Sequence, residues 1–304
     1  MNLLNNILYN TVYHSAPIIL CVLGGIFAYK ANVLNIALEG MMLIGAFVST
    51  LVALLTQSVG LGVLAAVAAS LVFGLIFSVI GVTWKGNVII AGLAVNLLAA
   101  SVAAFSLVIM GTSNITLQFL NLSSLKINIP FIREIPVLGP ILSGHTVITY
   151  LSFLLIAVMW AVMYKTRFGV YVRVVGENEE AAKSIGLKTE RYKYAAILIG
   201  AACCGLAGAN LSTERLGLFT GGMTAGRGFI AIAAIYCGQG SPVLSAAYAI
   251  LFGLARALSV DLSIYAGSAS GLFDIIPYLL MVCVLAVVSV LKRKNSRTRG
   301  FFHE

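Results

Sequence analysis

Long apolar runs recur along the whole of this chain and are separated by short polar connections. A helix needs about 20 apolar residues to cross a bilayer core, and in lipid it satisfies its own backbone hydrogen bonds. Runs that reach or approach this length lie at about 12–29, 40–56, 60–82, 87–110, 145–164, 194–211, 228–240, 242–260 and 274–291. We therefore predict an all-α polytopic membrane protein, with residues 1–304 forming one transmembrane domain of about nine helices (roughly eight to ten).

The composition favours a membrane protein over a water-soluble one. Of the 304 residues, 60% are hydrophobic and 10% are charged, whereas a soluble domain has about 25% charged residues. The net charge of +9 does not indicate a nucleic-acid partner, because the basic residues cluster in two connecting segments. The lipid bilayer is the expected partner of most of this surface.

The distribution of basic residues predicts the topology. Segment 165–193 contains seven Lys or Arg residues and the tail 292–304 contains five, whereas segment 111–144 contains only Lys126 and Arg133. Because cytoplasmic connections carry the excess of Lys and Arg, we expect the first two segments inside and 111–144 outside. Four runs lie between the two basic segments, which agrees with this assignment. Counting backwards through the earlier runs puts Trp84–Lys85 and Lys30 inside and the N-terminus outside. We expect segment 111–144 to form a short surface helix or a folded lid.

Residues 32–47 combine polar groups and glycines between two apolar runs. A charge such as Glu39 costs about 2.5–3.5 kcal/mol at mid-membrane on insertion scales, so it usually faces a cavity or a partner. The stretch is either a broken or tightly packed helix beside a polar pathway, or an interfacial loop with Glu39 in headgroup water. In the first interpretation Glu39 accepts hydrogen bonds from backbone or a neighbouring helix. The candidate pathway residues are Asn35, Glu39, Gly40 and Gly45.

A second glycine-rich stretch, 221–228, leads into the short apolar run 228–240. This run is too short to span easily, so it is either re-entrant or continues through Pro242 as a kinked pair. Short, glycine-interrupted segments in both halves of a membrane chain are typical of transporters with internal repeats and a central site. We therefore expect an internal repeat. Further possible pathway residues are Asn96, Gly226, Arg227, Gly228 and Phe229.

The basic segment contains the pattern of a short capped helix between 176 and 187. Asn178 is a good N-cap, and the acidic residues 179–180 suit the positive end of the helix dipole. Gly186 can end the helix in the left-handed conformation. About two turns are marginal alone in water, so the helix is either a solvated connection or a knob that docks into another protein.

Motifs for catalysis, metal binding and nucleotide binding are missing from the sequence. The five cysteines fall in apolar stretches without metal-ligand spacing and are expected to be small packing residues. The sequence has no Gly-x-x-x-x-Gly-Lys-Ser/Thr loop for ATP. We therefore expect neither an enzyme nor a cofactor site in this chain.

Three motifs carry a family resemblance: Asn-Ile-Ala-Leu-Glu-Gly-Met-Met-Leu from 35, Gly-Glu-Asn-Glu-Glu-Ala-Ala-Lys-Ser-Ile-Gly from 176, and Gly-Phe-Ile-Ala-Ile-Ala from 228. Over about 15–291 the chain resembles permease subunits of bacterial ABC importers, in the branch for simple sugars, branched-chain amino acids and nucleosides. The Asn-x-x-Leu-Glu-Gly form is most similar to the sugar and nucleoside permeases, guanosine-type ones in particular.

The resemblance implies a multi-pass protein of the bacterial cell membrane with three kinds of protein partner. These are an ATP-binding subunit, a second permease in a heterodimer, and an external substrate-binding lipoprotein. It also implies that the 165–193 segment couples the permease to ATP hydrolysis. The expected coupling residues are Gly176, Glu177, Asn178, Ala181, Ala182 and Gly186.

Three other functions remain open at this point. The nearest is an importer of the same kind for a simple sugar or a branched-chain amino acid. An ion-coupled secondary transporter would need a carboxylate that titrates within the membrane, and Glu39 is its only good candidate. The third is a purely structural membrane subunit. Co-purification with a soluble ATPase distinguishes the first from the other two.

Overall fold

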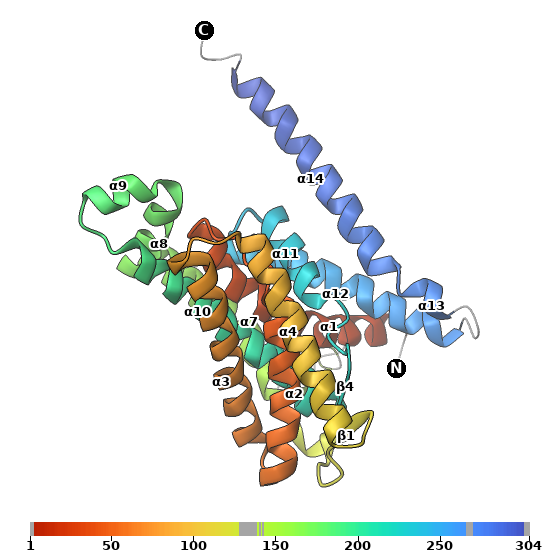
Figure 1. The fold of residues 1–304 in the computed structure, drawn as a ribbon. Coiled ribbons are helices and arrows are strands. Elements are labelled where there is room, and N and C mark those ends of the chain that lie inside the picture. Colours follow the sequence, from red (N-terminus) through yellow and green to blue (C-terminus); the bar gives the residue numbers. More distant parts are fainter. Residues whose placement is uncertain (1–2, 128–138, 140, 142, 266–269, 301–304) are drawn as a thin grey trace.

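The computed structural model describes residues 3–127, 139, 141, 143–265 and 270–300. This part of the chain is mostly helical (Figure 1). The α-helices are α1 (Leu3–Lys30), α2 (Leu38–Thr56), α3 (Val59–Ser78), α4 (Val88–Ile109), α7 (Val147–Lys165), α8 (Arg167–Glu177), α9 (Glu179–Ser184), α10 (Thr189–Ala209), α11 (Arg227–Cys237), α12 (Pro242–Tyr265), α13 (Ser270–Phe273) and α14 (Ile276–Gly300). Two π-helical segments, η1 (Val79–Thr83) and η3 (Asn210–Leu216), extend α3 and α10.

The apolar runs of the sequence all fall on helices. Within the described residues, 7 helices are long and apolar enough to cross a membrane, and two shorter apolar helices cover Arg227–Cys237 and Ile276–Val290. The prediction of a helical polytopic membrane protein is thus confirmed. The internal repeat stays a prediction.

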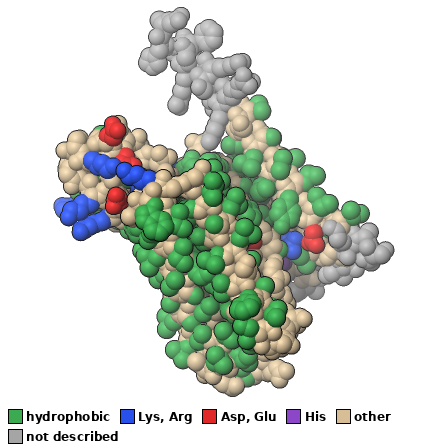
Figure 2. Space-filling view, in the orientation of Figure 1, with side chains coloured by type: hydrophobic (Ala, Val, Ile, Leu, Met, Phe, Trp, Pro, Cys, Tyr) green, Lys and Arg blue, Asp and Glu red, His purple; other side chains and the backbone are tan. Residues whose placement is uncertain are grey.

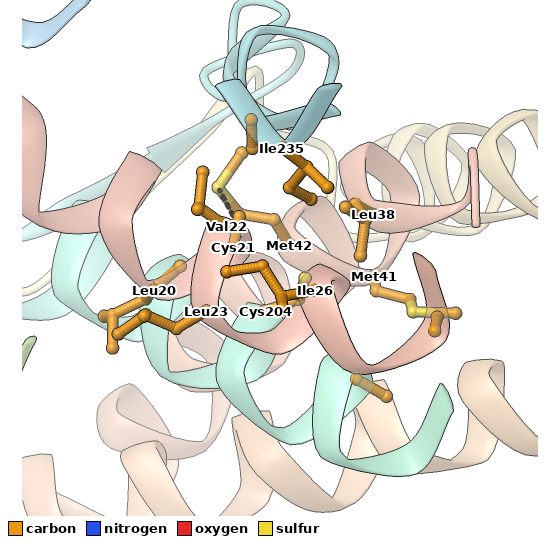
Figure 3. Close-up of a cluster of buried hydrophobic side chains, with 14 of the residues drawn as sticks. Leu20, Cys21, Val22, Leu23, Ile26, Leu38, Met41, Met42, Cys204 and Ile235 are labelled. Carbon is orange, nitrogen blue, oxygen red and sulfur yellow. Dashed lines mark hydrogen bonds between the residues drawn. The ribbon is translucent and has the colours of Figure 1, made fainter. Parts of the chain in front are cut away.

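Helices α1, α2 and α10 form the centre of the bundle. In their most apolar windows 83%, 67% and 72% of residues are buried, compared with 28% or less in α3, α4 and α7. The central helices therefore pack against protein on most sides, and the outer ones leave apolar faces for lipid. Figure 3 shows their shared core, in which Cys21 of α1 and Cys204 of α10 lie among aliphatic side chains. These cysteines are buried packing residues, as expected.

Small residues let the central helices approach closely. A Cβ on Gly24 of α1 would lie 2.8 Å from the Cα of Gly200 in α10. A Cβ on Gly45 of α2 would lie 2.9 Å from the Cα of Gly205 in α10. Because lipid is as apolar as a leucine side chain, close van der Waals packing of this kind is a main source of stability between membrane helices.

The two ends of the bundle carry different structures. Helices α8 and α9 lie at one end, and the larger group of charged side chains on the visible face lies over them, with a smaller group near α12 and α13 (Figures 1 and 2). Strands β1 (Asn114–Thr116) and β4 (Leu218–Thr220) pair at the opposite end. The segments predicted to be cytoplasmic and external therefore lie at opposite ends, as the charge pattern requires.

Segment 111–144 contains more strand than the sequence indicated. Besides β1 it contributes the 3-10 helix η2 (Leu122–Leu125) and strand β2 (Lys126–Ile127), which pairs with β3 (His145–Thr146). Part of the expected surface helix or lid lies in residues 128–138, outside the described residues. The strand β1 attaches this segment to the chain that leads into α11.

Helix α11 has 11 residues, so at about 1.5 Å per residue it covers roughly half of a bilayer core. A turn at 238–241 separates it from α12, whose first residue is Pro242. The run 228–240 is therefore a short separate helix and not part of one kinked span.

Candidate functional site: the junction of α2 and α11

Glu39 lies in the first turn of α2 and joins this helix to the start of α11. Its Oε1 accepts a hydrogen bond of 2.9 Å from the N–H of Gly226, and its Oε2 accepts one of 2.6 Å from the N–H of Gly228. The first N–H groups of a helix have no partner within the helix and carry its positive dipole end. The carboxylate therefore caps α11, which confirms the expectation that Glu39 bonds to backbone of a neighbouring element.

Two glycines make this cap possible. Gly226 has φ +70°, a left-handed conformation that L side chains rarely adopt. A Cβ on Gly228 would lie 2.5 Å from the backbone nitrogen of Glu39. Any larger residue at 228 would therefore push α11 away from α2.

The chain break beside Glu39 is only partly buried in the bundle. Residues 31–37 are not helical; Asn35 is only 4% exposed, whereas Asn32 is exposed and lines a surface pocket. Asn96 of α4 accepts a hydrogen bond from the N–H of Gly40 (2.7 Å) and donates one to the carbonyl oxygen of Ile36 (3.0 Å). An interfacial loop in headgroup water does not fit the burial of Asn35 or the hydrogen bonds of Asn96, so the interpretation as a broken and tightly packed region is the better one.

Gly40 and Gly45 can either bend a helix or let another helix approach closely, and the structure shows the second. Helix α2 is continuous from Leu38, so the backbone is broken before Glu39 and not at Gly40 or Gly45. A Cβ on Gly40 would lie 2.7 Å from the Cα of Asn96, and one on Gly45 would lie 2.9 Å from the Oγ of Ser70. These two glycines serve close packing instead of bending.

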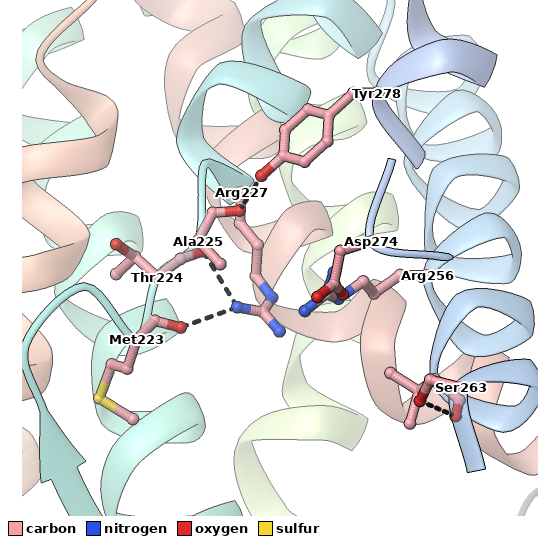
Figure 4. Close-up of polar contacts among 9 residues, drawn as sticks. Met223, Thr224, Ala225, Arg227, Arg256, Ser263, Asp274 and Tyr278 are labelled. Carbon is pink, nitrogen blue, oxygen red and sulfur yellow. Dashed lines mark hydrogen bonds and ion pairs between the residues drawn. The ribbon is translucent and has the colours of Figure 1, made fainter. Parts of the chain in front are cut away.

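Arg227 is the first residue of α11 and is 7% exposed. Its Nη1 donates to the carbonyl oxygens of Met223 (2.9 Å) and Thr224 (3.0 Å), so the side chain braces the turn before the helix (Figure 4). Tyr278 of α14 donates to the carbonyl oxygen of Ala225 in the same turn, at 2.7 Å. Phe229, by contrast, is 42% exposed. The structure thus brings Gly226, Arg227 and Gly228 to the junction and leaves Phe229 on the surface.

Two buried charged residues escaped the sequence analysis. Glu214 and Arg215 lie in η3 and are each 7% exposed. Glu214 accepts hydrogen bonds from Nδ2 of Asn210 (3.0 Å) and from the N–H of Ile148 (3.3 Å). The signal was present in the sequence, because adjacent acidic and basic residues follow the apolar run 194–211 directly. Single π-helical turns inside α-helices often mark functional sites.

The short helix α9 has the N-cap and the C-terminal glycine that the sequence predicted. Oδ1 of Asn178 accepts a hydrogen bond of 3.0 Å from the N–H of Ala181, and Gly186 has φ +83°. Glu179 pairs with Lys183 at 2.8 Å and with Lys193 of α10 at 2.5 Å. These hydrogen bonds lower the pKa of the Glu179 carboxyl to about 2 and tie α9 to α10.

Of the two alanines on the expected docking face of this helix, Ala181 and Ala182, only Ala181 is exposed. Ala182 is fully buried within the chain, while Ala181 is exposed and Ile185 is 69% exposed. In a helix this short, the side that faces α10 can only be seen in the folded chain. Gly176 and Glu177 belong to α8, and Gly176 packs directly against the carbonyl oxygen of Lys30. A partner can therefore contact Ala181 and Ile185, but not Ala182.

Comparison with known proteins identifies the family to which this chain is similar. The model of the family described as "Branched-chain amino acid transport system / permease component" matches residues 7–285. The guanosine ABC transporter permease NupQ of Bacillus subtilis is 34% identical over 96% of this chain and 92% of its own length. The nucleoside ABC transporter permease NupC of Lactococcus lactis is 31% identical over 94% of this chain and 93% of its own. A putative glucose ABC transporter permease of Haloferax volcanii, TsgC13, is 29% identical, with 86% of this chain and 78% of its own covered. No solved structure matches the chain.

Proposed function

Because this chain belongs to the family of permease components of branched-chain amino acid-type transport systems, we propose that it is the membrane subunit of an ATP-driven nucleoside importer. The observation that carries the proposal is the similarity to two nucleoside permeases across more than nine-tenths of the chain. As a permease component it moves the solute, and ATP is hydrolysed on a separate subunit.

The junction of α2 and α11 supports a transport pathway at this place. Irregular backbone is tolerated at membrane depth only where it is buried in protein or lines a cavity. Both the loop 31–37 and the start of α11 meet this condition. Discontinuous helices of this kind form the central sites of many transporters. In the proposal, Asn35, Glu39 and Asn96 hold the two breaks in register, and Gly226–Phe229 move with α11 when the pathway opens.

Helices α8 and α9 are the proposed coupling element. Segment 165–193 holds seven of the 19 Lys and Arg residues, and in the proposal it lies in the cytoplasm with the tail 292–304, with 111–144 and the N-terminus outside. The ion pair of Glu179 with Lys193 connects α9 to α10, and the pair with Lys183 lies within α9. A push on the exposed side of α9 then reaches the centre of the bundle. Single cysteines in place of Ser184 and Ser123 test this orientation, because an impermeant reagent should label only position 123 in intact cells.

The partners in this proposal are an ATP-binding subunit, a second permease and an external binding protein. Helix α14 extends away from the bundle (Figure 1) and exposes Leu279, Val282 and Val287 by more than half. A second permease is the proposed cover for part of this apolar surface, in a heterodimer. Lipid covers the remainder.

Reconstitution tests the function. The chain is purified with its ATPase and second permease, placed in vesicles with the binding protein, and assayed for uptake of labelled guanosine, glucose and leucine. We expect ATP-dependent uptake of guanosine, and none when the ATPase carries an inactivating substitution in its nucleotide-binding loop. Uptake of glucose or leucine, without uptake of guanosine, would show that the transported solute is not a nucleoside. Uptake driven by an ion gradient without an ATPase would overturn the proposal of an ATP-driven importer.

A further inference from the structure

A cavity of about 210 Å³ lies at the end of the bundle that carries the β-strands. It is formed between the first half of α1, strand β3 and the π-helical segment η3. Its polar and aromatic lining includes Tyr9, Asn10, Tyr13, His145, Glu214 and Arg215. In the proposed topology this is the external end, where a solute first enters the permease.

Arg215 is the unusual member of this lining. It is 7% exposed, and its Nε and Nη1 have no hydrogen-bond partner among the described residues. Its Nη2 lies 3.4 Å from Nδ1 of His14, and no ion pair joins it to Glu214 in the described part of the chain. Buried donors are nearly always bonded, so two unbonded nitrogens on one side chain are unusual. These two nitrogens have unused donor capacity, and they can meet an acceptor of a solute only if the side chain turns toward the cavity.

The walls of the cavity suit a flat ring. The rings of Tyr9 and His145 are stacked, with centroids 4.4 Å apart and an interplanar angle of 16°. The hydroxyl of Tyr9 donates to the carbonyl oxygen of Gly144 at 2.9 Å, which fixes this ring. The ring of Tyr13 lies 3.3 Å from the guanidinium carbon of Arg215. One face of Tyr9 is covered by His145 and one face of Tyr13 by Arg215, so a base can stack only on the opposite face of one of these rings. Stacking discriminates little between bases, so discrimination must come from a polar group.

We propose that this cavity is a subsite for the base of a 6-oxopurine nucleoside, such as guanosine or inosine, with Arg215 as the residue that selects it. A guanidinium donates in parallel to O6 and N7 of guanine, the commonest specific contact between arginine and a base. Adenine presents an N6 amino donor at the same edge, which opposes the donors of arginine. Nε and Nη1 of Arg215 are enclosed by protein. In this proposal the Arg215 side chain turns toward the cavity when the base enters, so that these nitrogens reach it. This inference rests on the proposed nucleoside import.

The test compares solutes in the reconstituted importer. Uptake of guanosine, inosine and adenosine is measured for the wild type, Arg215→Met and Arg215→Lys. A lost bidentate contact corresponds to about ten- to hundredfold in discrimination. We expect guanosine and inosine uptake to fall by about this factor in Arg215→Met while adenosine changes little. Arg215→Lys keeps the positive charge but lacks the two parallel N–H donors of a guanidinium, so it should show the same selective loss of guanosine and inosine uptake.

A second measurement does not depend on uptake. In a cysteine-free chain, Asn10→Cys places one thiol in the lining, and the rate of its labelling from outside is followed. Guanosine should slow the labelling, adenosine should not, and Arg215→Met should remove the protection.

Each outcome has a distinct meaning. Equal loss of all nucleosides, or an unchanged ratio, together with no protection at position 10, would overturn the subsite while leaving nucleoside import intact. A wild-type complex that carries no nucleoside at all would overturn the proposed function as well. If the Arg215 variants fail to assemble, protection of the Asn10→Cys thiol by guanosine in an otherwise wild-type chain decides the question.

Discussion

Replacing Glu39 should destabilise the protein in graded steps, because its two carboxylate oxygens accept hydrogen bonds from two backbone N–H groups of α11. Glutamine offers one acceptor oxygen and turns its amino group toward the other N–H, so one donor loses its partner. Alanine leaves both donors without a partner. At about 1–3 kcal/mol for each unsatisfied donor, Glu39→Gln costs about 1–3 kcal/mol and Glu39→Ala about twice that. Glu39 is half-buried, so water limits both losses and values near the lower end are expected.

Thermal unfolding of the purified complex is monitored by size-exclusion chromatography. ATP-driven uptake is measured on the same variants. The unfolding midpoint should fall in the order wild type, Gln, Ala, and uptake should follow the same order. Glu39→Asp is the matched control, because it keeps the charge but is one methylene too short to reach both donors. Midpoints for Gln and Ala equal to that of the wild type would refute the cap. A Gln variant with the wild-type midpoint and no uptake would instead favour a proton-coupled role for this carboxylate.

Three further predictions concern α11 and the cytoplasmic helix. Gly228→Ala should lower the unfolding midpoint, because its Cβ would lie 2.5 Å from the Glu39 nitrogen, whereas the control Gly221→Ala meets nothing within 4 Å; equal midpoints would contradict this. Ile185→Asp should weaken co-purification of the ATPase without changing the unfolding midpoint, because Ile185 is exposed, whereas Ala182→Trp should lower the midpoint, because Ala182 is buried. A lower midpoint for Ile185→Asp, with weaker co-purification only for Ala182→Trp, would reject the exposed face as the contact. The Glu179 pKa is lowered to about 2, so its stabilisation is complete above about pH 4.5 and is lost as pH falls toward 2. The protection of amides 178–187 from exchange, relative to an unstructured peptide at the same pH, should fall over that range, and in Glu179→Gln it should be low at every pH.

Helix α9 shows which features of a helix can be predicted from the local sequence. Asn178, the acidic first turn and Gly186 were identified correctly, because caps and left-handed glycines act within a few residues of their own position. The buried side of the helix could not be identified in the same way. Whether Ala182 faces a partner or α10 depends on the path of the chain after Gly186, which no local pattern contains.

The sequence by itself determined the class of fold and showed that a carboxylate, Glu39, lies among its apolar runs. The bilayer imposes a length on every apolar run, and a carboxylate at Glu39 needs a partner wherever it lies near the membrane interior. Only the tertiary structure decided that this partner is the start of α11, that Gly40 and Gly45 serve packing, and that Glu214 and Arg215 line a cavity with the beginning of α1. The physical reason is that lipid and protein core are equally apolar. Hydropathy therefore locates a membrane helix but does not say which of its faces meets another helix.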